Sequence, residues 1–266
     1  MGDGYSAAMF VHNINPALLR LGPFEIRFYG IVYAAALLFL MWHLGKAARS
    51  GRVKNLTEER AADLVLYCML ALLVGARIAH VLTRLEDYAA DPLHILFFWQ
   101  GGLAFFGGFI GVIVAAYALT RRWGVSFMTL ADEVVVPIPL FLALARVANF
   151  INAEMPGKFA DVPWAVLFPG YAGARHPSQL YEAAAMLLLL GAMVLLFRLK
   201  ARSGWKDGTL FWAFVGLYGA LRFAVEFFKE ADPVQLFGLS WMAYVSAGML
   251  LVGAGMLLRM RRKSPA

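Results

Sequence analysis

Two ionisable residues, Arg222 and Glu226, interrupt the long apolar run 210–228. An ionised side chain at the centre of a membrane helix costs roughly 2.5–3.5 kcal/mol on insertion scales, so each is expected to face a partner, a cavity or a substrate. Tyr218, Arg222 and Glu226 follow one another at intervals of four, which places them on one helical face. Two interpretations remain: the charges neutralise each other as a pair, or Arg222 binds an anionic ligand reached from the lipid.

A second polar set lies in the segment 145–158, which reads ARVANFINAEMPGK. Arg146, Asn149 and Asn152 recur at intervals of three where an apolar run ends, and Glu154 and Gly157 follow. The planar donor fork of arginine suits phosphate oxygens, so this set could form a cradle for a phosphate ester. The alternative is a polar helix end whose arginine reaches out to lipid head groups.

His176 precedes another apolar run, within the segment RHPSQLYE. Pro177, Ser178 and Gln179 are typical of a helix start, with the proline in the first turn and the polar side chains as caps. That interpretation is favoured. The functional alternative gives His176 a role in proton transfer or in contact with a lipid head group.

Glycines gather in the segment GGLAFFGGFIG, at the start of a further apolar run. Gly107 and Gly111 form a GxxxG pattern, which is typical of close helix packing. The paired glycines would also let a bulky lipid come close to the backbone; they are Gly101, Gly102, Gly107 and Gly108.

The other candidates are weaker. Tyr29, in IRFYGIVY, could donate a hydrogen bond into a cavity, while its neighbour Arg27 is typical of an interfacial anchor. Asp132 and Glu133 lie near the start of a span, where pairing is expected. Cys68 lies in an apolar run and fits a packing role. The sequence contains no HExxH motif and no paired aspartates, so we expect no metal and no cofactor.

Composition indicates an integral membrane protein, because 61% of the 266 residues are hydrophobic and 15% are charged. Soluble domains have about 45–50% apolar and about 25% charged residues. The apolar runs are long enough for helices that cross a bilayer, and they do not alternate as barrel strands do. The prediction is one all-α polytopic domain over residues 1–266. Its expected spans are 28–44, 61–82, 103–120, 128–147, 179–197, 209–228 and 241–258.

The distribution of Lys and Arg sets the expected orientation. Most basic residues outside the apolar runs lie in the segments 46–60, 121–122, 198–206 and 259–263. The positive-inside rule therefore predicts a cytoplasmic C-terminus and an extracytoplasmic N-terminus. Residues 148–178 become an extracytoplasmic loop between spans four and five, part of a small head region. Pro137 and Pro139 are expected to kink or break the fourth span.

Five segments together resemble the bacterial prolipoprotein diacylglyceryl transferases. The family pattern GRx[GA]NFxNxExxG matches ARVANFINAEMPG, except that Ala145 replaces the first glycine. The other matching segments follow the family order: GPFEIRFYGIVY, GGLAFFGG, PWAVLFP with RHPSQLYE, and YGALRFAVEFF. The resemblance covers roughly residues 14–258.

The resemblance implies a multi-pass enzyme of the bacterial inner membrane. Such an enzyme transfers the diacylglyceryl group of phosphatidylglycerol to the lipobox cysteine of a preprolipoprotein signal peptide; a thioether forms and glycerol phosphate leaves. By position, Arg146 and Arg222 would bind and polarise the lipid phosphate. The residues that would shape or support the site are Tyr29, Asn149, Asn152, Glu154, Gly157, Tyr218 and Glu226. The substrates would be the partners, with no nucleic acid, and a monomer would suffice.

Two departures from the family pattern bear on activity. Phe106 stands where many members have His or Tyr, and Lys229 stands where the family has Arg. The thiol proton therefore needs another acceptor, and His176, Glu154 and Tyr29 are the candidates. A catalytically reduced paralogue that binds lipid or signal peptide is an alternative, which Phe106→His would test. A transporter of an anionic lipid or solute is another, although no internal repeat is visible.

Overall fold

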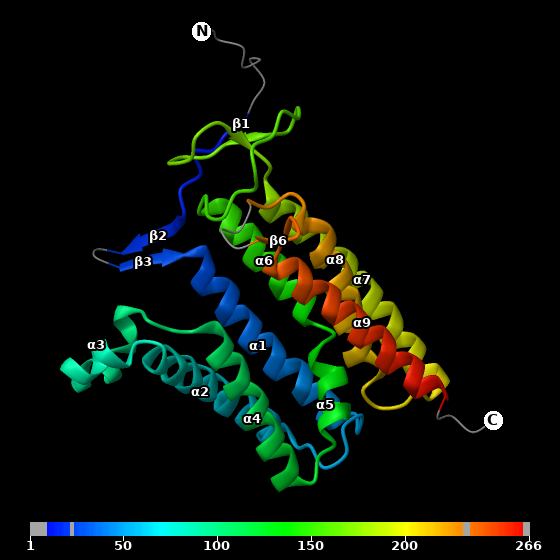
Figure 1. The fold of residues 1–266 in the computed structure, drawn as a ribbon. Helices are drawn as coiled ribbons and strands as arrows, with labels where there is room; N and C mark the ends of the chain where they lie inside the picture. The colour runs from blue at the N-terminus through cyan, green and yellow to red at the C-terminus, as the bar shows by residue number, and fades with distance from the viewer. Residues whose placement is uncertain (1–9, 22–23, 231–234, 263–266) are drawn as a thin grey trace, which may run out of the picture. The chain divides into compact units, whose positions relative to one another are not determined.

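A computed structural model shows that nearly all of the regular structure is helical, as the apolar runs predict (Figure 1). The structure describes residues 10–21, 24–230 and 235–262. Gly22 and Pro23, which belong to the N-terminal family motif, lie outside the described residues. The chain divides into two compact units: unit one comprises residues 1–36 and 134–266, and unit two comprises residues 37–133.

Six helices in the described part of the chain are long and apolar enough to cross a membrane. They are α1 (Phe28–Arg49), α2 (Glu58–Leu82), α4 (Phe105–Trp123), α7 (Ser178–Ser203), α8 (Thr209–Glu226) and α9 (Trp241–Arg262). A seventh span results if α5 (Phe127–Val134) and α6 (Ile138–Ile151) are counted as one broken span. The expected set of spans is confirmed on that count, and the chain is a multi-pass membrane protein.

The break between α5 and α6 lies where the two prolines stand. Pro137 is the residue just before α6, and Pro139 lies in its first turn. Proline has no backbone N–H and its ring obstructs the preceding turn, so a continuous helix cannot pass through this point. The predicted break is confirmed, and α6 begins afresh as the helix that carries Arg146.

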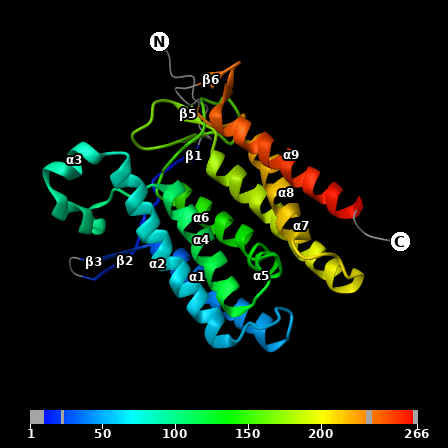
Figure 2. The same cartoon turned by 60° about the horizontal axis from the view of Figure 1, so that its bottom comes forward.

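In unit one, α6, α7, α8 and α9 lie side by side, each packed on the next (Figures 1 and 2). Leu189 and Met193 of α7 are fully buried with Leu210 of α8 in the apolar core. Glycine allows α8 and α9 to approach closely, because a Cβ at Gly219 would lie 2.6 Å from the Ser246 carbonyl oxygen. Small residues at such crossings are the usual packing device between membrane helices.

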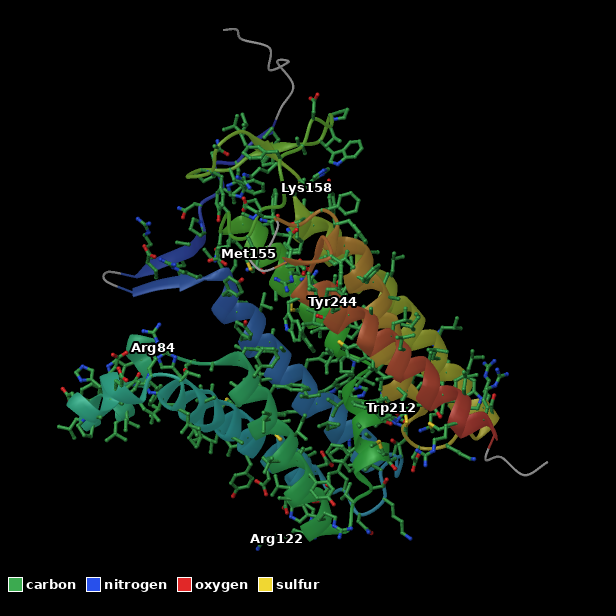
Figure 3. The ribbon with its side chains drawn as sticks, in the orientation of Figure 1. Arg84, Arg122, Met155, Lys158, Trp212 and Tyr244 are labelled. Atoms are coloured by element: carbon green, nitrogen blue, oxygen red, sulfur yellow. The ribbon has the colours of Figure 1, made fainter. Side chains whose placement is uncertain are left out.

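Short strands cover one end of unit one, a feature that the all-α prediction did not include. β1 (Phe10–Val11), β4 (Val166–Leu167) and β5 (Ala174–Arg175) form a sheet in the order β1-β4-β5. β2 (Ala17–Leu21) pairs with β3 (Phe24–Arg27), and β6 (Gln235–Leu236) pairs with β7 (Leu239–Ser240). Figure 3 shows Met155, Lys158 and Tyr244 at this end of the helices and Trp212 toward the other.

In unit two, α2 and α4 pack along the predicted glycine face (Figure 2). Gly107 and Gly111 face Gly75 of α2, and Gly108 faces Leu72 and Ala76. A Cβ at Gly108 would lie 3.1 Å from the Leu72 carbonyl oxygen, so the two backbones are close. The packing interpretation of the GxxxG pattern is therefore confirmed.

Between α2 and α4 the chain forms α3 (Leu85–Ala90) and two short 3-10 turns, η1 (Pro92–Leu96) and η2 (Phe98–Gln100). Arg77 of α2 donates hydrogen bonds to the carbonyl oxygens of Ile95 at 2.9 Å and Gly101 at 2.8 Å. Gly101 and Gly102 both have positive φ angles, of 96° and 75°. Arg77, which lies inside the apolar run of α2, is thus occupied with backbone carbonyls of its own unit.

Glu133 of α5 has a structural role within unit two. Glu133 is buried and accepts hydrogen bonds from Arg52, with 2.8 Å between Oε1 and Nε. His43 lies 3.1 Å from the other carboxylate oxygen. The expected pairing role is therefore confirmed for Glu133.

Candidate active site

The charged residues of α8 lie on one face and pair with each other. Arg222 is 8% exposed and donates through Nη1 to Glu226 Oε2. Ser240 of β7 donates to the other carboxylate oxygen at 2.6 Å. The self-pairing interpretation is thus correct as far as it goes. Among the described residues, Arg222 Nε and Nη2 contact no acceptor, so most of the donor fork is available to a ligand.

The polar residues at the end of α6 converge, as their spacing predicts. Asn149 donates through Nδ2 to Tyr29 Oη and, at 3.0 Å, to Glu154 Oε2. Tyr29 donates to the same carboxylate oxygen at 3.2 Å, and Asn152 donates to Oε1 at 3.1 Å. Arg146 Nη1 donates to Asn149 Oδ1 at 3.1 Å. A hydrogen-bonded cluster therefore links Arg146 to Tyr29 of α1 and to the Glu154 carboxylate.

The backbone around Glu154 adopts an uncommon conformation. Ala153 and Met155, on either side of it, have φ angles of 56° and 52°. Residues other than glycine rarely occupy this left-handed region, and doing so costs of order 1–3 kcal/mol. The turn is held from α7, where Gln179 donates to the Glu154 carbonyl at 2.6 Å and Ser178 to the Met155 carbonyl at 3.3 Å.

The expectation that Ser178 and Gln179 cap α7 is therefore wrong. Pro177 precedes the helix, and no side chain caps its first turn. Both polar side chains instead bond the carbonyls of the loop after α6. A sequence pattern cannot distinguish a local cap from such a tertiary contact, because both use the same short polar residues.

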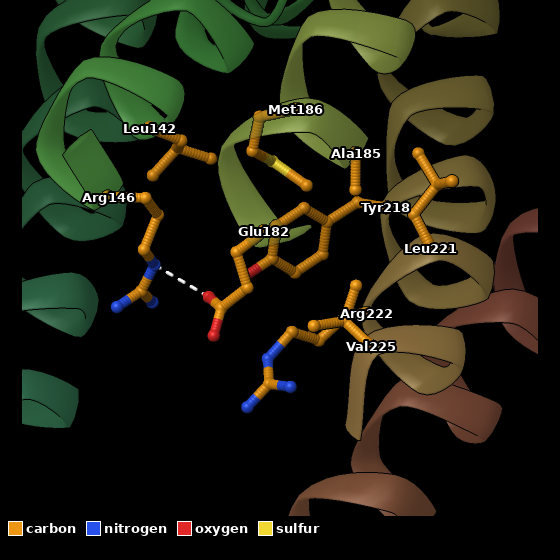
Figure 4. Close-up of a pocket in the computed structure, with 9 residues that line it drawn as sticks. All are labelled: Leu142, Arg146, Glu182, Ala185, Met186, Tyr218, Leu221, Arg222 and Val225. Atoms are coloured by element: carbon orange, nitrogen blue, oxygen red, sulfur yellow. Dashed lines mark ion pairs between the residues drawn. The ribbon is translucent and has the colours of Figure 1, made fainter. Parts of the chain in front are cut away.

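Arg146 and Arg222, which are far apart in the chain, line the same cavity with Tyr218 (Figure 4). The cavity measures about 20 Å³, which is little more than the space that one water molecule needs. Entry of a lipid head group therefore requires the polar side chains that line the cavity to move apart.

A third charged residue of this cavity, Glu182, was missed by the sequence reasoning. Its carboxylate lies 2.6 Å from Arg146 Nε and 2.7 Å from Lys229 Nζ, and Figure 4 shows it between the two guanidinium groups. The available signal was an acidic residue at the fourth position of the expected span 179–197, in the matched segment RHPSQLYE.

Gly157 and His176 join the loop after α6 to the start of α7. Gly157 N donates to the His176 carbonyl at 2.9 Å, and a Cβ at Gly157 would lie 2.9 Å from that same oxygen and still closer to the Phe228 carbonyl. His176 Nδ1 lies 3.0 Å from Tyr181 Oη. Burial and the nearby Lys158 ammonium lower the pKa of His176, so its neutral form predominates near neutral pH.

Glu226 and Lys229 also line a larger cavity, of about 210 Å³, together with Lys158 and Ser240. The ion pairs Arg222–Glu226 and Glu182–Lys229 therefore each join a residue of the small cavity to a residue of the larger one. The four glycines predicted to contact substrate, Gly101, Gly102, Gly107 and Gly108, belong to unit two. Their contacts there are described above, and a role in substrate binding stays a prediction.

The fold and the cavity define a class: a polytopic helical membrane protein in which two arginines of different helices line one cavity. The family model of the prolipoprotein diacylglyceryl transferases matches residues 16–259, and the chain belongs to that family.

Several curated relatives support this membership. A phosphatidylglycerol–prolipoprotein diacylglyceryl transferase of Bordetella bronchiseptica is 38% identical over 252 residues, covering 92% of this chain and 95% of the relative. The enzyme of that name in Brucella anthropi is 36% identical over 269 residues, covering 97% and 95%. One in Geobacter sulfurreducens is 38% identical over 223 residues, covering 83% and 84%.

Proposed function

We propose that this chain transfers the diacylglyceryl group of phosphatidylglycerol to a prolipoprotein, the reaction named for its family and relatives. The observation that carries the proposal is the shared cavity of Arg146 and Arg222. Two guanidinium groups that converge among membrane helices attract the negative charge of a phosphodiester, and the planar fork of each suits its oxygens.

The chemistry follows from this placement. The sulfur of the lipobox cysteine attacks the glyceryl carbon that carries the phosphate ester. The carbon–oxygen bond breaks and its electron pair goes to the phosphate oxygen, so glycerol phosphate leaves with a second negative charge. Arginines in a poorly hydrated cavity stabilise this growing charge more strongly than arginines in water would.

The thiol proton must pass to an acceptor, because the thiolate is the nucleophile. Phe106 cannot accept it. His176 is one candidate, since its lowered pKa keeps the imidazole neutral. Glu154 is the second candidate, because three side-chain donors hold its carboxylate in place. Tyr29, the third candidate, is one of those donors. Comparing the pH profiles of turnover for His176→Gln, Glu154→Gln and Tyr29→Phe identifies the residue whose loss removes the acidic limb.

The finer assignments follow from the same proposal. The enzyme acts as a monomer in the bacterial inner membrane, with its loop 148–178 on the extracytoplasmic side, where a signal peptide presents its lipobox cysteine. Phosphatidylglycerol enters from the lipid, and Tyr218 and Glu226 support Arg222 from its own helix.

The decisive experiment uses purified protein in detergent with phosphatidylglycerol and a lipobox peptide. We expect release of glycerol phosphate and a diacylglyceryl mass increase on the peptide cysteine, in equal amounts. Arg146→Ala or Arg222→Ala should lower turnover by about 100-fold or more, in the range seen when a transition-state donor is removed.

The matched control is Arg202→Ala, at the exposed end of α7, which should retain wild-type turnover. Full turnover by a folded Arg146→Ala or Arg222→Ala variant would refute the phosphate-binding role. If wild type binds phosphatidylglycerol but forms no product, and Phe106→His does form it, the chain is the catalytically reduced paralogue.

A further inference from the structure

Glu182 is a buried carboxylate of the cavity that contacts two cations. It lies in the second turn of α7, and its residue is 5% exposed. One carboxylate oxygen contacts Arg146 of α6 and the other contacts Lys229, three residues beyond the end of α8. A single side chain thus ties together three segments of unit one.

The contacts of Arg146 show what this carboxylate does to the guanidinium group. Nε is held by Glu182 at 2.6 Å and Nη1 by Asn149 at 3.1 Å. Among the described residues, no acceptor contacts Nη2. In Figure 4 the end of this guanidinium points to the same side of the cavity as that of Arg222. Arg146 is therefore fixed at two nitrogens, and the third is left to donate to a phosphate oxygen.

The sum of the charges around the cavity also supports a role for Glu182. The residues joined by ion pairs at the cavity are three cations, Arg146, Arg222 and Lys229, and two buried or nearly buried carboxylates, Glu182 and Glu226. Their sum is a single positive charge, which equals in size the charge of one phosphodiester. Without Glu182 the sum would be two, and Arg146 and Lys229 would repel each other across a poorly hydrated space.

We infer that Glu182 is a positioning residue, which orients Arg146 toward the lipid phosphate and balances the charge of Lys229. The inference rests on the proposed transferase function. Glu182 touches neither the attacking sulfur nor the breaking bond; it acts through Arg146. Misplacing a catalytic group by about 1 Å can lower turnover roughly 100-fold.

The test is Glu182→Gln, which keeps the shape and removes the charge. We expect turnover to fall at least tenfold, while phosphatidylglycerol binds severalfold more tightly because the cavity gains net positive charge. A merely structural defect would weaken binding and turnover together. Glu182→Asp should recover part of the turnover. The control is Glu58→Gln, which removes the carboxylate of an exposed ion pair with Arg49 in unit two. It should change neither turnover nor lipid affinity.

A double variant separates the two parts of the role. In Glu182→Gln with Lys229→Met, the extra positive charge is gone, so affinity should return to the wild-type value. Turnover should stay low, because Arg146 is still not held. Persistent tight binding would show that Lys229 is not the unbalanced charge, and recovered turnover would show that Glu182 does not act through Arg146.

The outcomes also separate this inference from the proposed function. Wild-type product with unchanged Glu182→Gln turnover and affinity overturns the positioning role and leaves the transferase intact. Weaker binding by Glu182→Gln, in step with lower turnover, overturns it as well. If wild type forms no product, the transferase proposal fails, and lipid affinity still decides whether Glu182 balances charge.

Discussion

The Glu154 carboxylate receives hydrogen bonds from three side chains that belong to α1, α6 and the turn after α6. The Tyr29 hydroxyl has two of the contacts in this cluster, as donor to Glu154 and as acceptor from Asn149. A neutral hydrogen bond contributes about 0.5–1.5 kcal/mol net, and one to a charged group about 1.5–3 kcal/mol. The Tyr29 hydroxyl should therefore matter for activity through the orientation of Glu154 and Asn149.

Tyr29→Phe tests this role, because it removes the hydroxyl and keeps the ring. We expect turnover to fall about tenfold, which corresponds to about 1.4 kcal/mol, and thermal stability to fall as well, because two hydrogen bonds are lost. The control is Tyr33→Phe, whose ring stacks on that of Tyr29 with centroids 6.0 Å apart. Equal losses in the two variants would mean that the Tyr29 hydroxyl has no specific role in activity.

The lowered pKa of His176 predicts a pH dependence of stability. The unfolded chain takes up a proton near pH 6.5, its ordinary value, and the folded protein takes it up only at lower pH. Between the two values the unfolded state binds more protons, so stability falls as the pH falls. The loss should be absent above about pH 7.5 and should grow toward about pH 5.5.

His176→Gln should remove this part of the pH dependence, because glutamine does not titrate. The melting temperature of wild type relative to that of the variant, measured in detergent across that range, should fall as the pH falls. Curves that stay parallel would show that other groups cause the acid sensitivity.

At the residue scale, much of the candidate site follows from spacing. Arg146, Asn149 and Asn152 are close because they recur along one helix, and Arg222 and Glu226 pair for the same reason. The contact of Arg146 with Glu182 joins residues of different helices, and no local pattern encodes it. The left-handed φ angles of Ala153 and Met155 are equally hidden, because neither residue type favours that conformation.

At the element scale, the crossing of α8 and α9 determines where Tyr218 and Arg222 lie. Gly219→Ala should force the helices apart, since its Cβ would lie 2.7 Å from Leu250 N and 2.6 Å from the Ser246 carbonyl oxygen. We expect a loss of about 1–3 kcal/mol, in the range of overpacked interiors, and reduced turnover. Both are measurable by thermal unfolding and product formation in detergent.

Gly248→Ala on α9 is the matched control, because its Cβ would meet nothing within 4 Å. It should leave turnover unchanged and leave stability unchanged or slightly raised, given the better helix propensity of alanine. A Gly219→Ala variant as stable as this control would mean that α8 and α9 can separate without loss.

The long helices could be predicted from the sequence, and the short strands could not. Long apolar runs give the spans directly, and Pro137 and Pro139 mark the break before α6. The two-residue strands β1 and β4 could not be predicted, since their pairing joins Phe10 to Val166 across most of the chain. Such short strands form through tertiary contacts and have no periodicity of their own.

At the scale of the whole molecule, the distribution of basic residues predicts the orientation in the membrane. In a Cys68→Ala background, Tyr171→Cys should react with a membrane-impermeant maleimide added to intact spheroplasts. Ser203→Cys, at the other end of α7, should react only after the membrane is opened. The reverse pattern would invert the orientation and place the loop 148–178 in the cytoplasm.

The turn that carries Glu154 has a consequence for the energetics of each catalytic cycle. Two residues in strained conformations hold the carboxylate, and the strain is sustained by contacts from α7. That energy is spent once, when the chain folds, and need not be supplied by the lipid at every turnover. The Glu154 carboxylate is therefore held in place before the lipid binds, so its positioning adds little to the entropy lost on reaching the transition state.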